Sequence, residues 1–326
     1  MMTRLFSWAP LFSWEGFLFA ALIVIFTFNA IWTPDFLGIL NQINLFQLSI
    51  EKIILALVMT FVIINAEIDL SIGSMMGLSA CAFGYMVEQG TAAPLAIVIC
   101  LCIGVIGGLF NGWFIANLGL PSLVVTLATM IGFRGLARVL AEDHSIGNFP
   151  AWFANLGQKG LIGPIPFALI CFFTLFFLLY ILLERSGFGR KTYVIGSNRD
   201  VADFAGIDTA KHKLIIFVMS GTAAAFAGLL YAARVGSVRG DVASGFELDV
   251  ITIVLLGGVS IFGGKGTLIG TLLSILIVLT LRNGMGLLSI TGHIQTGVIG
   301  LLLIASVVLP RIKLAKPMTA KRESTS

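Results

Sequence analysis

The chain has 326 residues, of which 58% are hydrophobic and 11% are charged, and its mean hydropathy is +1.02. So apolar a composition excludes a water-soluble domain folded around one core and predicts an integral membrane protein. The net charge of +4 is too small to indicate a nucleic-acid-binding protein. We therefore expect membrane lipid, and not nucleic acid, as the surroundings of the chain.

Apolar runs long enough to cross a bilayer recur along the whole sequence. A spanning helix needs about 20 mostly apolar residues, so about ten such helices would use about 200 residues and leave little for soluble domains. The clearest run, residues 166–183, contains no charged residue. Further spans are expected at residues 16–33, 50–66, 71–88, 94–117, 121–140, 214–233, 248–262, 267–283 and 293–309.

The sequence thus predicts an all-α membrane protein with about ten transmembrane helices, in one transmembrane domain over residues 1–309. Residues 127–135 and 256–264 are similar, since each is a run of small and apolar residues that ends in Phe-x-Gly. This similarity favours two related halves of five spans each, an arrangement that some transporters use.

The stretch INAEIDLSIGS, residues 64–74, is the densest group of polar residues inside the apolar runs. It contains Asn65, Glu67, Asp69 and Ser71, and such residues within a membrane usually face protein or a water-filled route. One interpretation is a broken helix that lines a solute path. The other is an ordinary cytoplasmic turn in which Asp69 or Ser71 caps the next helix. The residues alone leave both interpretations open.

Other polar residues inside the expected spans are weaker candidates for the path, since they could equally form hydrogen bonds between helices. They are Asn111, Thr126, Asn283 and Gln295. Arg134 and Arg138 lie near the outer end of the fifth span, where we expect them to extend outward to the membrane surface. We expect Glu247 and Asp249 to begin the eighth span from the outside, where they cap it or meet a soluble receptor.

Lysine and arginine residues gather in two places, and cytoplasmic loops retain positive charge during insertion. The two groups are Arg185, Arg190, Lys191, Arg199, Lys211 and Lys213, and then Arg311, Lys313, Lys316, Lys321 and Arg322. The spans expected before and between these groups place both termini in the cytoplasm. The loop at 184–213 is then cytoplasmic, and residues 310–326 form a basic, disordered tail near anionic lipid.

The cytoplasmic loop contains one short predicted helix, at 198–205. Residues Ser197 to Asp200 have the Ser-x-x-acid pattern of a helix start, and Gly206 can supply a left-handed stop. Val201, Phe204 and Ala205 share one apolar face, while Asp200 and Asp203 point elsewhere. A helix shorter than about 12 residues is marginal in water, so we expect it to dock on the membrane domain or on a cytosolic partner. A merely solvated loop is the alternative.

The stretch GGVSIFGGKGT, residues 257–267, has glycines and a lysine before a threonine but does not match a nucleotide-binding P-loop. Gly258 is one residue too far from Gly264, and Gly266 separates Lys265 from the threonine. We expect Gly263, Gly264 and Gly266 to form a tight cytoplasmic turn instead. The four cysteines lie in apolar runs without metal-ligand or redox spacing, so neither a metal nor a cofactor is predicted.

Several motifs together resemble the permease subunits of bacterial ABC sugar importers, in the branch that includes ribose, rhamnose and autoinducer-2 permeases. They are EIDLSIGSMMGLSA at 67–80, LPSLVVTLATMIGFRGLARVLAE at 120–142, GRKTYVIGSNRDVADFAGI at 189–207 and GFELDVITIVLLGGVSIFGGKGTLIG at 245–270. The resemblance covers residues 50–309 and is colinear with the family pattern. The sequence departs from that pattern at Ala66 and Glu67, where the family commonly has glycines.

The resemblance implies a transport subunit of the bacterial inner membrane and not an enzyme. Its partners would be ABC ATPase subunits that hydrolyse ATP, a second permease subunit and a periplasmic sugar-binding protein. The 184–213 loop would seat in a groove of the ATPase. Phe204 would be the anchor of that contact. The other coupling residues would be Asn198, Arg199, Asp200, Val201, Asp203 and Gly206.

The expected function is therefore an ATP-driven importer permease that forms the path for a monosaccharide or a similar polyol or furanosyl solute. A second hypothesis is an ion-coupled secondary transporter, for which Glu67 is the attractive intramembrane carboxylate. A third is a membrane enzyme that acts on a lipid-linked substrate. The sequence lacks paired carboxylates, a metal cluster and a nucleophile with its base, which disfavours the third hypothesis.

Overall fold

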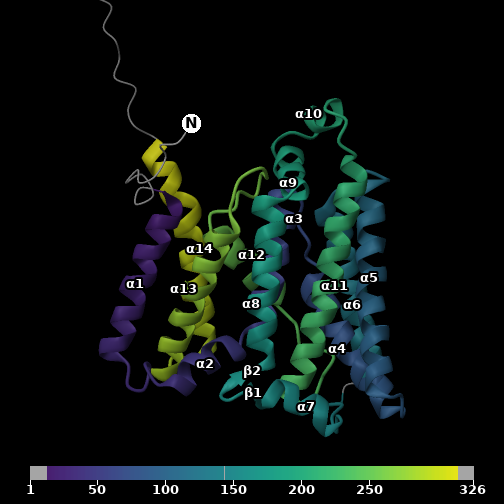
Figure 1. The fold of residues 1–326 in the computed structure, drawn as a ribbon, viewed down its shortest axis with the longest axis vertical. Helices are drawn as coiled ribbons and strands as arrows, with labels where there is room; N and C mark the ends of the chain where they lie inside the picture. Colours follow the sequence, from purple (N-terminus) through teal and green to yellow (C-terminus); the bar gives the residue numbers. More distant parts are fainter. Residues whose placement is uncertain (1–12, 143, 315–326) are drawn as a thin grey trace, which may run out of the picture.

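The computed structural model describes residues 13–142 and 144–314, which form a bundle of long helices standing side by side (Figure 1). The first half of the bundle contains α1 (Trp14–Trp32), α2 (Ile39–Gln47), α3 (Ile50–Ile64), α4 (Ile72–Glu88), α5 (Ala93–Ala116), α6 (Ser122–Ala141) and α7 (Ala151–Gln158). A short antiparallel hairpin follows, made of β1 (Gly160–Ile162) and β2 (Ile165–Pro166).

The second half begins with α8 (Phe167–Tyr180), which continues as the π-helix η2 (Ile181–Arg185). It goes on with α9 (Gly187–Ser197), α10 (Arg199–Phe204), α11 (Thr209–Val235), α12 (Phe246–Leu256), α13 (Leu268–Leu287) and α14 (Gly292–Leu314). Because α14 extends to Leu314, the start of the expected disordered tail, residues 310–314, is helical. Residues 315–326 of that tail lie outside the described part of the chain.

The mostly helical membrane fold expected from the sequence is confirmed, and every expected span contains a helix. Within residues 13–142 and 144–314, six helices are long and apolar enough to cross a membrane, or seven if the bent pair α2–α3 forms one span. The six are α1, α5, α6, α8 with η2, α11 and α13. Helices α4 and α12 are shorter, with 17 and 11 residues.

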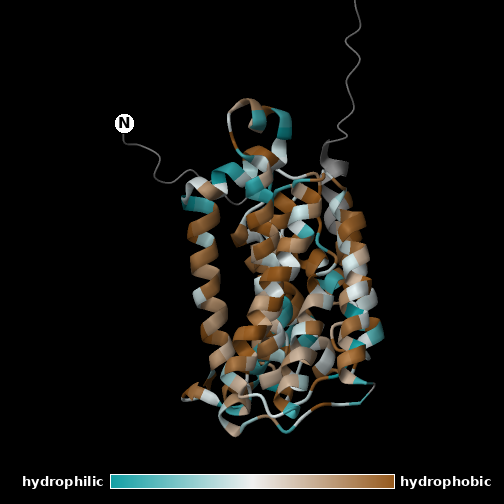
Figure 2. Cartoon of the chain, turned by 90° about the vertical axis from the view of Figure 1, so that its right-hand side faces the viewer, coloured by the Kyte–Doolittle hydropathy of each residue, from teal (hydrophilic) through white to brown (hydrophobic). Residues whose placement is uncertain are grey.

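Hydrophobic residues cover the long helices, and hydrophilic residues concentrate at the two ends of the bundle (Figure 2). Helices α9 and α10 lie at one end, and α7 and the β1–β2 hairpin lie at the other (Figure 1). The start of α1 lies at the same end as α10, as do the final turns of α14. The described ends of the chain therefore share one side of the bundle with the basic loop.

Helix α3 is the centre of the bundle. Every residue of α3 other than Lys52 is buried, because α11, α12, α8 and α13 all pack around it. Such a buried helix is apolar over most of its surface, and its polar residues are Glu51, Lys52 and Thr60.

The closest helix packing joins α5 and α11. A methyl group added at Gly108 would meet the main chain of Phe217, and one added at Gly112 would meet Leu214. Gly221 of α11 lies against Gly104 in the same way. Small residues allow two helices in a membrane to approach until their backbones touch, so this glycine stripe fixes α11 beside α5.

Candidate functional site

The coupling helices, α9 and α10, stand at one end of the bundle (Figure 1). The Asn198 side-chain oxygen accepts the N–H of Val201 at 3.1 Å, so Asn198 is the N-cap of α10. The expected cap, Ser197, instead donates to the Tyr193 carbonyl at 2.8 Å and ends α9. The predicted helix at 198–205 is therefore confirmed with its start one residue later, at Arg199. Gly206 has the expected left-handed conformation, with φ +75°.

Phe204 projects from α10 into the surroundings with 93% of its surface exposed, and Val201 is 56% exposed. The buried residue of this helix is Ala202, so α10 rests on the protein by its small side and exposes its large apolar residues. Asp203 accepts a hydrogen bond from Thr209 of α11 at 2.7 Å and lies 3.8 Å from Arg199. Asp200 is exposed. The seven predicted coupling residues thus form one short projecting element.

Helix α9 is fixed to the bundle by close backbone contacts. A methyl group added at Gly196 would meet the Ile64 carbonyl, which already accepts the Gly264 N–H at 2.8 Å. The phenol of Tyr193 donates to the Gly266 carbonyl at 2.9 Å, and burial together with the nearby Glu184 carboxylate raises the pKa of that phenol. It therefore remains a protonated donor at neutral pH.

The glycine turn, residues 263–266, forms as the sequence predicts. Gly263, Gly264 and Gly266 all have positive φ, at 78°, 68° and 136°. Only glycine adopts such angles readily, and the turn brings its backbone against Ala66 and Ser197. The turn therefore joins the end of α9 to the chain that follows α3.

The broken segment, residues 65–71, connects α3 to α4 without regular structure. It is buried except for Ala66, which is exposed and has φ 61°, and the half-buried Ile68 and Leu70. Neither expected residue caps α4, since no side chain bonds to the first turn of that helix. The segment is therefore an irregular, mostly buried stretch, without the side-chain cap that the alternative interpretation expected.

Side chains from two helices, α6 and α11, hold the broken segment. The Ile68 N–H donates to Ser122 Oγ at 3.2 Å, and Thr126 Oγ1 donates to the Ile68 carbonyl at 3.2 Å. Ser220 of α11 donates to Asp69 Oδ2 at 2.6 Å. Both backbone groups of Ile68 and the carboxylate of Asp69 are therefore hydrogen-bonded, as irregular backbone inside a membrane requires.

The other Asp69 oxygen begins a polar chain toward α5. Asp69 Oδ1 accepts the Ser71 N–H at 2.9 Å and the Ser71 hydroxyl at 2.6 Å. The Asn111 amide nitrogen then donates to Ser71 Oγ at 2.8 Å. Asn111 Oδ1, Ser74 Oγ and both polar atoms of Asn65 are buried without a hydrogen-bond partner within the described residues. Unsatisfied polar atoms of this kind are available to a polar solute or to water.

The structure brings six of the eight predicted path residues together and separates two. Asn65, Glu67, Asp69 and Ser71 belong to the broken segment itself, where Asn111 bonds to Ser71 and Thr126 bonds to the Ile68 carbonyl. Asn283 instead exchanges hydrogen bonds with Asn41 of α2, and Gln295 donates to the Ile290 carbonyl. These two residues, in the ninth and tenth expected spans, therefore form their hydrogen bonds away from the broken segment.

Glu67 forms a buried ion pair with Lys213 in the first turn of α11. This partner could not be predicted from the sequence, because the two residues are far apart along the chain. A carboxylate that binds coupling ions must be free to exchange its partner, and a carboxylate already paired with a lysine is poorly suited to that role. The ion-coupled hypothesis is therefore not favoured.

Helices α4 and α12 begin close together inside the bundle. A methyl group added at Gly73 of α4 would lie 2.8 Å from a Glu247 carboxylate oxygen and 3.3 Å from its backbone nitrogen. Glu247 is 6% exposed and forms an ion pair with Arg134 of α6 at 3.1 Å. The expectation that Arg134 extends outward was wrong, because the acidic start of α12 is buried beside α6 and offers it a partner.

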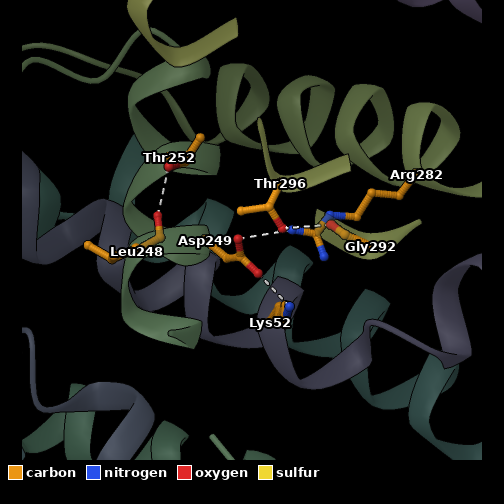
Figure 3. Close-up of polar contacts among 7 residues, drawn as sticks. All are labelled: Lys52, Leu248, Asp249, Thr252, Arg282, Gly292 and Thr296. Atoms are coloured by element: carbon orange, nitrogen blue, oxygen red, sulfur yellow. Dashed lines mark hydrogen bonds and ion pairs between the residues drawn. The ribbon is translucent and has the colours of Figure 1, made fainter. Parts of the chain in front are cut away.

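A second charged cluster anchors α12 to its neighbours (Figure 3). Asp249 Oδ2 lies 2.5 Å from Lys52 of α3, and Oδ1 lies 2.9 Å from Arg282 of α13. Asp249 was expected to cap its helix or meet a receptor. Its carboxylate instead pairs with one residue of α3 and one of α13, and so links three helices. Helix α12, at about 16 Å long, covers only half of a bilayer, so these pairs hold a partial span in place.

A separate apolar groove of about 600 Å³ lies between α3, α5, α8 and α11. Val58, Leu101, Leu179 and Phe226 are among its lining residues, and none of the polar residues around the broken segment lines it. The groove is therefore distinct from the candidate path.

The comparison with protein families gives a match over residues 41–307 to the model described as "Branched-chain amino acid transport system / permease component". The chain belongs to this permease family. It is 35% identical over 299 residues to the ribose import permease protein RbsC of Bacillus subtilis, covering 91% of this chain and 92% of that protein. It is a transport permease and not an enzyme.

A second group of relatives transports a different solute. The autoinducer 2 import system permease protein LsrD of Salmonella typhimurium is 36% identical over 308 residues, which cover 91% of each chain. The protein of the same name from Yersinia enterocolitica is 34% identical over 261 residues, or 78% of each chain. No solved structure matches this permease. The family resemblance expected from the motifs is thus confirmed.

Proposed function

We propose that the chain is the membrane-spanning subunit of an ATP-driven importer in the bacterial inner membrane, and that it forms the path for a monosaccharide or a similar polyol or furanosyl solute. The observation that carries this proposal is the likeness to ribose and autoinducer-2 import permeases over about nine-tenths of this chain and of theirs. The family description also includes branched-chain amino acids, but the ribose and autoinducer-2 import permeases among its relatives support a hydroxyl-rich solute.

The subunit works with partner chains. ABC ATPase subunits bind the coupling helices in the loop at 184–213, a second permease subunit completes the path, and a periplasmic binding protein delivers the solute. The exposed Phe204 supports the docking role, because a large aromatic at the tip of a helix loses contact with water when a partner groove covers it. Asn198, Arg199, Asp200 and Asp203 provide the polar rim.

In the membrane, about ten spans form one permease domain over residues 1–309, with both termini cytoplasmic. The described ends of the chain lie at the same end of the bundle as the coupling helices, and this supports the proposed topology (Figure 1). The path runs past the broken segment, where Asn65, Asp69, Ser71 and Asn111 offer donors and acceptors to solute hydroxyls. The similar stretches 127–135 and 256–264 support two halves of five spans.

Reconstitution tests the function directly. The purified chain, its second permease subunit, its ATPase and its binding protein are placed in lipid vesicles, and uptake of labelled ribose is followed with and without ATP. We expect uptake only with ATP, and competition by other furanosyl sugars but not by leucine. Uptake that needs an ion gradient and no ATP would overturn the importer proposal, while ATP-driven leucine uptake would overturn the solute class.

A further inference from the structure

The ion pair between Lys213 and Glu67 lies deep in the protein, between the first turn of α11 and the start of the broken segment. Only 9% of the lysine side chain and 11% of the glutamate side chain are exposed. Charges in such surroundings attract each other strongly, and removal of one partner leaves the other charge buried and uncompensated. The two residues are therefore held together more firmly than an exposed pair would be.

The first turn of α11 also contacts both coupling helices. Thr209 donates to Asp203 of α10 at 2.7 Å. The ring of His212 lies 4.2 Å from that of Phe188 in α9, and its Nε2 is 2.8 Å from the Thr192 hydroxyl. Lys213 is the next residue, so one turn of helix contacts α10, α9 and the broken segment.

On its other side, Glu67 leads directly into the polar network of the candidate path. The next residue, Ile68, is hydrogen-bonded to α6 through both its backbone groups. Asp69 is hydrogen-bonded to Ser220, which lies further along α11 than Lys213. Ala66, which precedes Glu67, lies against Gly263 of the glycine turn. The ion pair thus joins the coupling helices to the chain that carries the path residues.

We propose that the Lys213–Glu67 pair is a positioning element that makes the broken segment move together with the coupling helices when an ATPase subunit displaces them. The inference rests on the proposed function. Neither residue touches the solute; they act on the segment that does. The pair also gives a physical reason for Glu67 where the family commonly has glycine, since a lysine buried at position 213 needs an anionic partner.

The test compares solute transported per ATP hydrolysed in reconstituted vesicles. Lys213→Met and Glu67→Gln each break the pair, and the double neutral variant removes both charges so that none stays buried alone. We expect each variant to transport about tenfold less solute per ATP, because coupling between two sites is typically 5- to 150-fold. ATP hydrolysis itself is expected to stay within about twofold of the wild type, since α10 is unchanged in all of them. The reversed pair, Glu67→Lys with Lys213→Glu, is expected to restore most of the ratio.

A control variant is Asp241→Asn, which breaks the exposed Arg239–Asp241 pair, whose side chains are 65% and 62% exposed. It should leave the ratio unchanged. If the neutral double variant folds and keeps the wild-type ratio, or if transport and hydrolysis fall in proportion, the pair is only structural and the proposal is wrong. A wild type without ATP-dependent uptake would instead refute the proposed function, and this inference with it.

Discussion

Helix α10 and the broken segment are both short, yet they are stabilised in opposite ways. Helix α10 is formed by neighbours in the sequence, with Asn198 as cap and Gly206 as stop, and it leaves Phe204 93% exposed. The broken segment is held by distant side chains, among them Ser122 and Ser220, and its polar residues Asn65, Glu67, Asp69 and Ser71 are buried. A surface that binds a partner can expose its apolar anchor, whereas backbone inside a membrane must be paired.

The two regions meet at a joint of closely packed backbone. Ile64 ends α3, and its carbonyl oxygen accepts the Gly264 N–H. The same oxygen occupies the space that a side chain on Gly196 of α9 would need. We therefore expect displacement of α9 to shift the end of α3 and the segment that follows it, because there is no side chain between these backbones to absorb the movement.

The largest effect on this comparison is expected from Asp69→Ala in the broken segment. The change leaves the Ser71 N–H, the Ser71 hydroxyl and the Ser220 hydroxyl without their acceptor. A buried donor without a partner costs about 1–3 kcal/mol, so we expect a loss of roughly 3 kcal/mol in the free energy of unfolding. Thermal unfolding in detergent measures it.

Asp200→Ala in α10 is the matched control, because Asp200 is exposed. It should change the free energy of unfolding by less than about 0.5 kcal/mol. Equal unfolding temperatures for the two variants would show that the segment does not depend on its polar network.

The joint itself is tested by Gly196→Val. The new side chain would occupy the space of the Ile64 carbonyl, so α9 must move or the helix end must shift, at about 1–3 kcal/mol. We expect lower thermal stability together with faster hydrogen exchange in α9. Gly187→Ala in the same helix is the control, since its methyl group would meet only the Arg190 side chain at 3.7 Å. If both variants unfold alike, the two regions are not joined there.

The smallest effect is expected from Asn198→Ala. The loss of the cap on α10 costs about 1 kcal/mol of local helix stability, and the bundle below it is untouched. Hydrogen exchange at residues 199–204 should quicken severalfold while the unfolding temperature of the protein stays the same. Asn198→Ser retains a capping oxygen and should exchange like the wild type. A fall in global stability would mean that α10 supports the bundle, contrary to its exposed position.

Sequence reasoning succeeded where the signal is local. Apolar runs located the helices, Gly206 marked the end of α10, and the positive φ of Gly263 and Gly264 agrees with the expected turn. It failed by one residue at the cap, because Ser197 and Asn198 are both good capping residues and only the final turn of α9 decides between them.

Long-range pairs could not be predicted in the same way. Arg134 with Glu247, and Asp249 with Lys52 and Arg282, join residues from different helices, and Glu67 with Lys213 joins the broken segment to α11. The sequence shows these charged residues close to apolar runs, where a buried charge without a partner is energetically unfavourable. The partners depend on how the helices pack, which no periodicity in the sequence encodes. For the same reason, Asn283 and Gln295 were assigned to the path although they bond elsewhere.

The central claim is that an ATPase subunit docks on the coupling helices, and Phe204→Asp tests it most directly. The tagged chain is purified from its native membrane in mild detergent, and the recovered P-loop ATPase is quantified by mass spectrometry. Loss of a central aromatic anchor costs at least about 2 kcal/mol, so we expect the variant to remain in the membrane and recover over tenfold less ATPase. Leu161→Asp, at an exposed residue of β1, should recover the normal amount. Equal recovery of ATPase with Phe204→Asp and with the wild type would contradict the account.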